Sequence, residues 1–141
     1  MAVNAENVQK KERDIAPLDQ REFDIVLFGA TGFTGKLAAA YLAKQYGSTI
    51  RWAMAGRRES ALQKIKTDLG EGAASAGVII ADANNLEQIR GMVRRTKVVC
   101  TTAGPFDKYG HTLVAECAAE GTSYCDITGE VLSVKKLFAC V

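Results

Sequence analysis

The sequence predicts a doubly wound α/β domain, in which a parallel sheet of about five strands carries helices on both faces. Short apolar runs alternate with helical patterns along most of the chain, as in repeated strand–helix–strand units. The apolar runs are mostly continuous, which is typical of strands covered on both faces. Right-handed crossovers then favour the strand order 3-2-1-4-5.

The elements follow one another in a regular order. The apolar runs expected to form strands are residues 24–28, 50–55, 78–81, 98–102 and 124–127. Helical spacing of apolar residues predicts helices over 34–46, 62–69, 86–93 and 113–118. A further apolar helical pattern begins at Val131, shortly before Val141. We therefore expect a domain over 23–141 that is truncated at its C-terminal end and lacks a substrate domain.

Length and composition are those of one ordinary globular domain. The chain has 141 residues, of which 48% are hydrophobic and 24% charged, and a net charge of +2. Without a large basic excess, nucleic acid is not an expected partner. No stretch approaches the roughly 20 apolar residues of a transmembrane helix. Residues 1–22 carry charges of both signs, and we expect them to form a mobile tail.

The four cysteines predict neither a metal site nor a disulfide framework. They form no C-x-x-C pair, and no histidine is placed to complete a zinc site. Cys100 and Cys125 lie in apolar runs, so we expect buried, reduced thiols. This cysteine usage indicates the cytoplasm or another reducing compartment.

A glycine-rich segment joins the first expected strand to the first helix. It is Gly29-Ala30-Thr31-Gly32-Phe33-Thr34-Gly35, with the spacing G-x-x-G-x-x-G. In such a loop the first glycine permits the turn, the second lets phosphate approach the backbone, and the third allows close packing of helix on strand. The helix dipole favours an anion there. The segment is predicted to bind the pyrophosphate of a nicotinamide dinucleotide; the alternative is a turn that serves only the fold. The hydroxyl groups of both threonines can bind phosphate or cap the helix.

The residues after the next strands predict which dinucleotide binds. Arg57 follows the second strand, where an acidic residue would bind the ribose of NAD and an arginine the 2′-phosphate of NADP. NADP is therefore favoured over NAD, although a solvated loop would also account for the arginine. Asp82 ends the third strand and can accept a hydrogen bond from adenine or cap the following turn. Ala103, Gly104 and Pro105 follow the fourth strand and leave room for the nicotinamide ribose.

No catalytic set is evident. Tyr109 and His111 flank a glycine after the fourth strand, and either can serve as a proton donor, but a surface role is the simpler interpretation. The Y-x-x-x-K pair of short-chain dehydrogenases is absent. An atypical relative of those enzymes, acting as an NADP sensor or regulatory binding protein, remains an alternative.

Four sequence blocks in this order resemble the saccharopine dehydrogenase-like oxidoreductase family. They are 29–35, 55–57, 103–110 and 125–130. The resemblance covers about residues 23–132 and implies an NADP-dependent reductase fold, with relatives that include trans-acting enoyl reductases of lipid synthesis. It also implies a long C-terminal region that holds the substrate site, and relatives that associate with membranes or lipid droplets. The block 128–130 is expected to shape the cleft rather than perform chemistry.

The same reading predicts how a domain without that region behaves. It would expose an edge of the sheet and the apolar side chains Leu132, Leu137 and Phe138. Self-association through this edge and the C-terminal helix is therefore possible, as is an unstable fragment without a function of its own.

Overall fold

The computed structural model describes residues 15–139 and shows strands and helices in strict alternation. The strands are β1 (Phe23–Phe28), β2 (Trp52–Gly56), β3 (Gly77–Ile80), β4 (Thr96–Thr101) and β5 (Ser123–Asp126). The helices are α1 (Phe33–Gln45), α2 (Glu59–Asp68), α3 (Leu86–Val93), α4 (Phe106–Glu120) and α5 (Val131–Phe138). Two short 3-10 helices, η1 (Leu18–Gln20) and η2 (Gly70–Ala73), precede β1 and β3.

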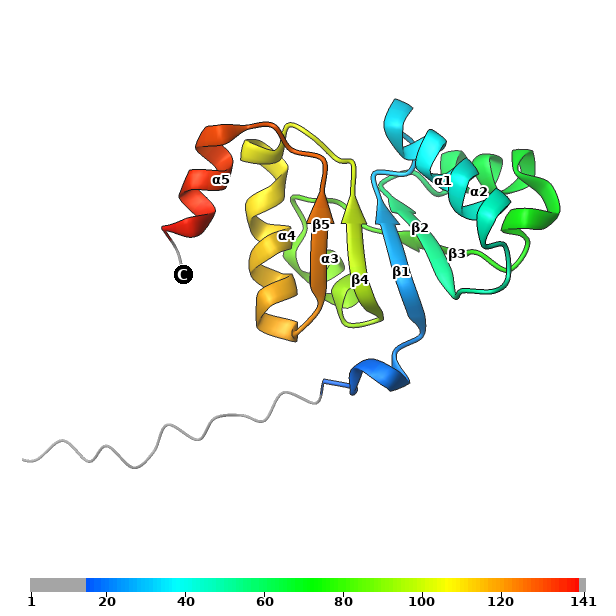
Figure 1. Ribbon diagram of the computed structural model, residues 1–141, viewed down its shortest axis with the longest axis horizontal. Helices are drawn as coiled ribbons and strands as arrows, with labels where there is room; N and C mark the ends of the chain where they lie inside the picture. The colour runs from blue at the N-terminus through cyan, green and yellow to red at the C-terminus, as the bar shows by residue number, and fades with distance from the viewer. Residues whose placement is uncertain (1–14, 140–141) are drawn as a thin grey trace, which may run out of the picture.

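The five strands form one parallel sheet in the order β3-β2-β1-β4-β5, which confirms the predicted fold class. In Figure 1 all the arrows point the same way, so the carboxyl ends of the strands lie along one edge. β1 pairs with β2 on one side and with β4 on the other, where Phe28 is in register with Ala55 and with Thr101. The crossovers therefore leave β1 in opposite directions, and the carboxyl ends of β1 and β4 form a switch point.

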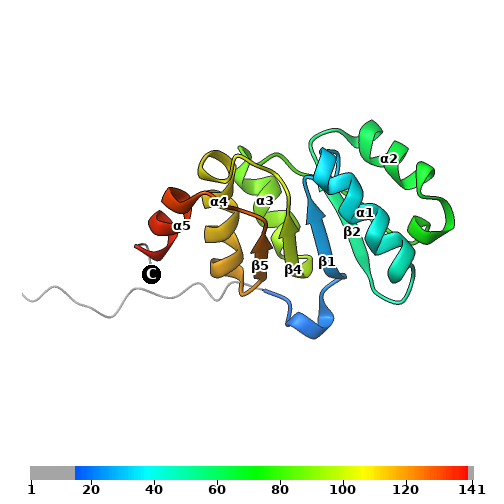
Figure 2. The same ribbon diagram turned by 45° about the horizontal axis from the view of Figure 1, so that its top comes forward.

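Two apolar cores lie on the two faces of the sheet. On one face, Ile89, Met92 and Leu113 from α3 and α4 pack against Val26 and Val99. On the other face, side chains of α1 and α2 pack around Leu27 and Trp52. Figures 1 and 2 show these helix pairs on opposite sides of the sheet. Burial on both faces explains why the central strands read as continuous apolar runs.

Some boundaries differ from the sequence prediction. β4 begins at Thr96 rather than at residue 98, and α4 begins at Phe106, well before the apolar residues from Leu113 onward that predicted it. The first turns of α4 carry charged and aromatic residues without a clear apolar period. A contact from a distant segment supports this helix start, as described below.

A buried arginine connects the segment before β1 to the amino edge of the sheet. Arg21 is only 3% exposed. Its guanidinium donates to the carbonyl oxygen of Thr96 at 2.6 Å, to that of Glu120 at 2.6 Å and to the hydroxyl of Thr122. It also lies 3.5 Å from the carbonyl oxygen of Val93, so one cation meets the last residues of both α3 and α4, where helix dipoles favour positive charge.

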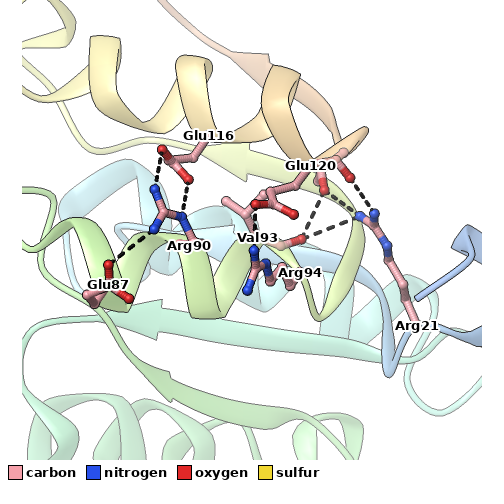
Figure 3. Close-up of polar contacts among 8 residues, drawn as sticks. Arg21, Glu87, Arg90, Val93, Arg94, Glu116 and Glu120 are labelled. Carbon is pink, nitrogen blue, oxygen red and sulfur yellow. Dashed lines mark hydrogen bonds and ion pairs between the residues drawn. The ribbon is translucent and has the colours of Figure 1, made fainter. Parts of the chain in front are cut away.

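Ion pairs between α3 and α4 extend this contact (Figure 3). Arg90 pairs with Glu116 at 2.9 Å, and Arg94 pairs with the buried Glu120 at 3.0 Å. The tail predicted over 1–22 lies outside the described residues up to position 14. Within the described part, Arg21 belongs to the packed body of the domain.

The expectation that Cys100 and Cys125 are buried is correct only in part. Cys100 is half-buried, but Cys125 is exposed; Cys117, for which burial was not predicted, is buried. The reason is the position of β5 at the edge of the sheet, where its exposed residues alternate with half-buried ones such as Tyr124, which packs on the core shared with α4. Helices α1 and α2 pack on β1, β2 and β3, at the other end of the sheet, and so do not cover β5 (Figure 1).

We expect Arg21→Met to lower the free energy of unfolding by about 3 kcal/mol, because several buried acceptors lose their donor. Urea denaturation followed by circular dichroism measures this change. Arg95→Met is the matched control, since Arg95 is 42% exposed in its ion pair with Glu22, and it should cost at most about 1 kcal/mol. Equal losses in the two variants would contradict the role assigned to Arg21.

Candidate functional site

The glycine segment forms a tight turn from β1 into α1. Gly29 has φ +85°, a conformation that side chains disfavour, and a Cβ there would lie 2.9 Å from the backbone nitrogen of Ala103. A Cβ on Gly35 would lie 2.1 Å from the carbonyl oxygen of Gly29. Both glycines are therefore required by the close approach of two backbones, as the motif predicts.

A hollow of about 230 Å³ opens at the carboxyl edge of the sheet beside this turn. The structure brings together seven of the predicted site residues around it. They are Gly29, Thr31, Gly32, Arg57, Asp82, Ala103 and Gly104. They come from the ends of β1, β2, β3 and β4, which meet here because the sheet is parallel. This edge is where open α/β sheets bind ligands.

Five other predicted residues do not line the hollow. Ala30 and Gly35 are buried beneath the turn, where they support its backbone. Phe33 is 84% exposed, and Thr34 and Pro105 are exposed as well. Gly32 is the N-cap residue of α1, and no side chain caps this helix among the described residues. The hydroxyl groups of Thr31 and Thr34 are therefore not used as caps.

The two polar residues predicted at the ends of the second and third strands, Arg57 and Asp82, both border the hollow. Arg57 directly follows β2, is exposed and borders the hollow. Arg58 instead borders a neighbouring hollow of about 250 Å³ with Lys36, so several cations surround the turn. The carboxylate of Asp82 accepts a hydrogen bond from the backbone N–H of Asn84 at 2.9 Å. It therefore closes the turn before α3, and its contact with an adenine amino group stays a prediction.

Tyr109, the candidate proton donor, also lines the hollow. Further lining residues that the sequence did not single out are Phe28, Ala83, Asn84 and Thr102. Thr102 donates its backbone N–H to the carbonyl oxygen of Phe28 at 3.0 Å, and its hydroxyl donates to that of Gly29 at 3.2 Å. These bonds join the end of β4 to the glycine turn. The only signal for Thr102 is its place at the end of the fourth apolar run.

The structure separates the two candidate proton donors. Tyr109 lies on α4 and lines the hollow, whereas the ring of His111, on the same helix, contacts Asp107 at 3.3 Å and does not line the hollow. The carboxylate that contacts His111 is also paired with Lys136 at 2.7 Å, away from the residues that line the hollow. The geometry therefore assigns no catalytic residue among residues 15–139.

The thiols of Cys100 and Cys117 do not add a reactive group. Burial raises the pKa of Cys100 to about 11 and that of Cys117 to about 12. Both groups are therefore protonated at neutral pH and are poor nucleophiles. Within residues 15–139, no group of three or more His, Cys, Asp or Glu side chains is arranged to hold a metal ion.

We expect Gly35→Ala to lower the free energy of unfolding by about 3 kcal/mol or more, because the added Cβ overlaps the backbone of Gly29. Thermal unfolding measures the loss. Gly32→Ala is the matched control: its Cβ would meet nothing nearer than 3.4 Å, and its melting temperature should stay near that of the unmodified protein. A stable Gly35→Ala protein would refute the packing role of this glycine.

Comparison with known proteins places this site in context. No protein-family model matches the chain. A trans-acting enoyl reductase of Mycobacterium tuberculosis is 50% identical over 113 residues, which is 80% of this chain and 27% of the relative. The trans-acting enoyl reductase of Mycobacterium leprae is 49% identical over 114 residues, with 81% and 27% covered. The chain thus spans little more than a quarter of the length of these relatives.

Solved structures share the fold. Apo saccharopine dehydrogenase (L-Glu forming) from Saccharomyces cerevisiae matches with a TM-score of 0.67 at 16% identity, over 82% of this chain and 24% of that one. A short-chain dehydrogenase/reductase from Veillonella parvula, solved in complex with NADP, matches with a TM-score of 0.61 at 16% identity, over 84% and 57%. The chain thus shares a Rossmann-type fold with these oxidoreductases, and its sequence resembles the trans-acting enoyl reductases over about a quarter of their length.

Proposed function

We propose that the chain binds NADP(H) at the carboxyl edge of its sheet and supplies the cofactor-binding part of an oxidoreductase. The observation that carries this proposal is the hollow beside the glycine turn, which Arg57 and Asp82 border on one side and Ala103 and Gly104 on the other. Backbone N–H groups at the start of α1 and the dipole of that helix favour a pyrophosphate. An arginine after β2, where NAD-binding domains carry an acid, favours the 2′-phosphate of NADP over the free ribose of NAD.

The strand order sets the orientation of the dinucleotide in this proposal. The adenosine half lies toward the ends of β2 and β3, near Arg57 and Asp82. The pyrophosphate crosses the turn at Gly32, and the nicotinamide half lies toward the end of β4, near Thr102 and Ala103. This placement explains why the small residues follow β4 and the charged residue follows β2.

The chemistry of the longer relatives suggests what the bound cofactor is for. The sequence relatives are named trans-acting enoyl reductases, and reduction of an enoyl group requires a hydride donor such as NADPH. We infer that the residues described here hold the hydride donor, while groups outside residues 15–139 bind the acyl substrate and deliver the proton. This chain by itself should bind NADPH without oxidising it.

Arg57→Ala should lower the preference for NADPH over NADH by about tenfold, because a charge-assisted hydrogen bond to the 2′-phosphate is lost. Isothermal titration calorimetry with both nucleotides measures the ratio of dissociation constants. Arg51→Ala, at the opposite end of the same strand segment, is the control and should leave the ratio unchanged. No binding of either nucleotide by the unmodified protein would end the proposal, and an unchanged ratio in Arg57→Ala would end the assignment of Arg57.

We also propose that this domain self-associates through β5 and α5. Within residues 15–139, β5 pairs only with β4. On α5, Val131, Leu132 and Phe138 are between 73% and 79% exposed. Val131 and Phe138 line an open apolar hollow of about 450 Å³. Exposed apolar side chains favour association, and so does a strand edge that has no neighbouring strand.

Phe138→Lys should keep the protein monomeric over a concentration series in which the unmodified protein gains mass, because a lysine opposes burial of this surface. Sedimentation velocity measures the mass. Leu37→Lys, an exposed apolar position on α1, is the control and should associate like the unmodified protein. An unmodified protein that stays monomeric throughout would contradict the proposed contact.

None of the helices between residues 15 and 139 combines the length and apolarity that a bilayer crossing needs.

A further inference from the structure

Helix α4 begins without a cap from its own N-terminal residue. Its N-cap is Pro105, which has no side-chain acceptor to offer the first turn. The backbone N–H groups of Phe106 and Asp107 have no carbonyl partner within the helix, as at every helix start. The loop that precedes them contains Thr102, Ala103 and Gly104, which line the hollow.

The missing cap comes from a segment that follows β5. One carboxylate oxygen of Glu130 accepts a hydrogen bond from the backbone N–H of Phe106 at 2.8 Å, and the other accepts from Asp107 at 2.8 Å. Both oxygens are therefore engaged by consecutive N–H groups. The negative charge at the positive end of the helix dipole adds to these bonds.

A chain of hydrogen bonds holds Glu130 in this position. The hydroxyl of Tyr124 donates to the carboxylate of Asp126 at 2.6 Å, and the other oxygen of Asp126 accepts from the backbone N–H of Thr128 at 2.9 Å. The hydroxyl of Thr128 accepts from the backbone N–H of Glu130 at 3.0 Å. Burial and the bond to Asp126 raise the pKa of Tyr124, so it stays protonated as a donor.

The loop held by Glu130 is also in contact with the glycine turn. Ala103 lies so close to Gly29 that a Cβ on the glycine would be 2.9 Å from its nitrogen. A shift of α4 at its start therefore moves the residues at the end of β4, which face the nicotinamide half in the orientation proposed above. The adenosine side, bordered by Arg57 and Asp82, has no contact with Glu130 in the hydrogen bonds of the described chain.

We propose that Glu130 is a positioning residue, which fixes the loop between β4 and α4 so that it accepts the nicotinamide half of the dinucleotide. The inference rests on the proposed dinucleotide binding and assigns a role to a residue outside the hollow. It explains why a carboxylate is needed: glutamine offers one acceptor oxygen in place of two, and its amide donors would face an N–H group.

The test uses two ligands that differ in the half they occupy. Adenosine 2′,5′-bisphosphate fills only the adenosine side, whereas NADPH fills both sides. In Glu130→Gln we expect the dissociation constant of NADPH to rise about fivefold and that of adenosine 2′,5′-bisphosphate to change less than about twofold. Calorimetric titration of both ligands, with a melting curve of each variant, measures these effects. If the protein prefers NADH, the pair becomes NADH and ADP.

The control is Glu116→Gln, which removes a glutamate charge from α4 itself. Glu116 pairs with Arg90 of α3 and does not contact the start of α4, so Glu116→Gln should leave the affinities for both ligands unchanged. If Glu130→Gln does not fold, Thr128→Val takes its place, because it removes the hydroxyl that accepts from the backbone N–H of Glu130. It should also raise the dissociation constant of NADPH. The proposal would be overturned if Glu130→Gln weakened the binding of both ligands equally, or if it left the affinity for NADPH unchanged. An unmodified protein that binds none of the ligands would instead refute the proposed function.

Discussion

The pairing of β1 with β2 on one side and β4 on the other governs the rest of the structure. Because all strands are parallel, each connection must cross a face of the sheet, and the two directions away from β1 send the crossovers to opposite faces. The connections therefore diverge at the carboxyl ends of β1 and β4. The hollow lies where the connections diverge, and the glycine turn at the end of β1 lines it.

Charged side chains bind backbone groups at both ends of the strands, outside the two apolar cores. At the amino edge, Arg21 meets the last carbonyl groups of α3 and α4 and the start of β4. At the carboxyl edge, Glu130 meets the first N–H groups of α4. The two ends of α4 are thus neutralised by charges of the sign that the helix dipole favours, one from each side of the helix in sequence.

Long sequence separation distinguishes these two contacts from the glycine turn. Gly29 and Gly35 act on one another within a single turn, so a local motif predicts them. Arg21 reaches residues 75 and 99 positions away, and Glu130 reaches back 24 positions. The glycine turn therefore depends on residues close together in the chain, whereas the start of α4 depends on a residue that follows β5.

The sequence by itself determined the fold class, the strand order and the glycine turn, because periodicity and glycine spacing report local geometry. It also identified Arg57, Asp82, Ala103 and Gly104, since residues after parallel strands share one edge. Only the tertiary structure decided which members of the turn face the hollow, that Thr102 and Tyr109 join them, and that Cys125 is exposed. It alone revealed the buried Arg21 and the cap from Glu130. Both depend on contacts between segments far apart in the chain, and no local pattern of residues encodes such contacts.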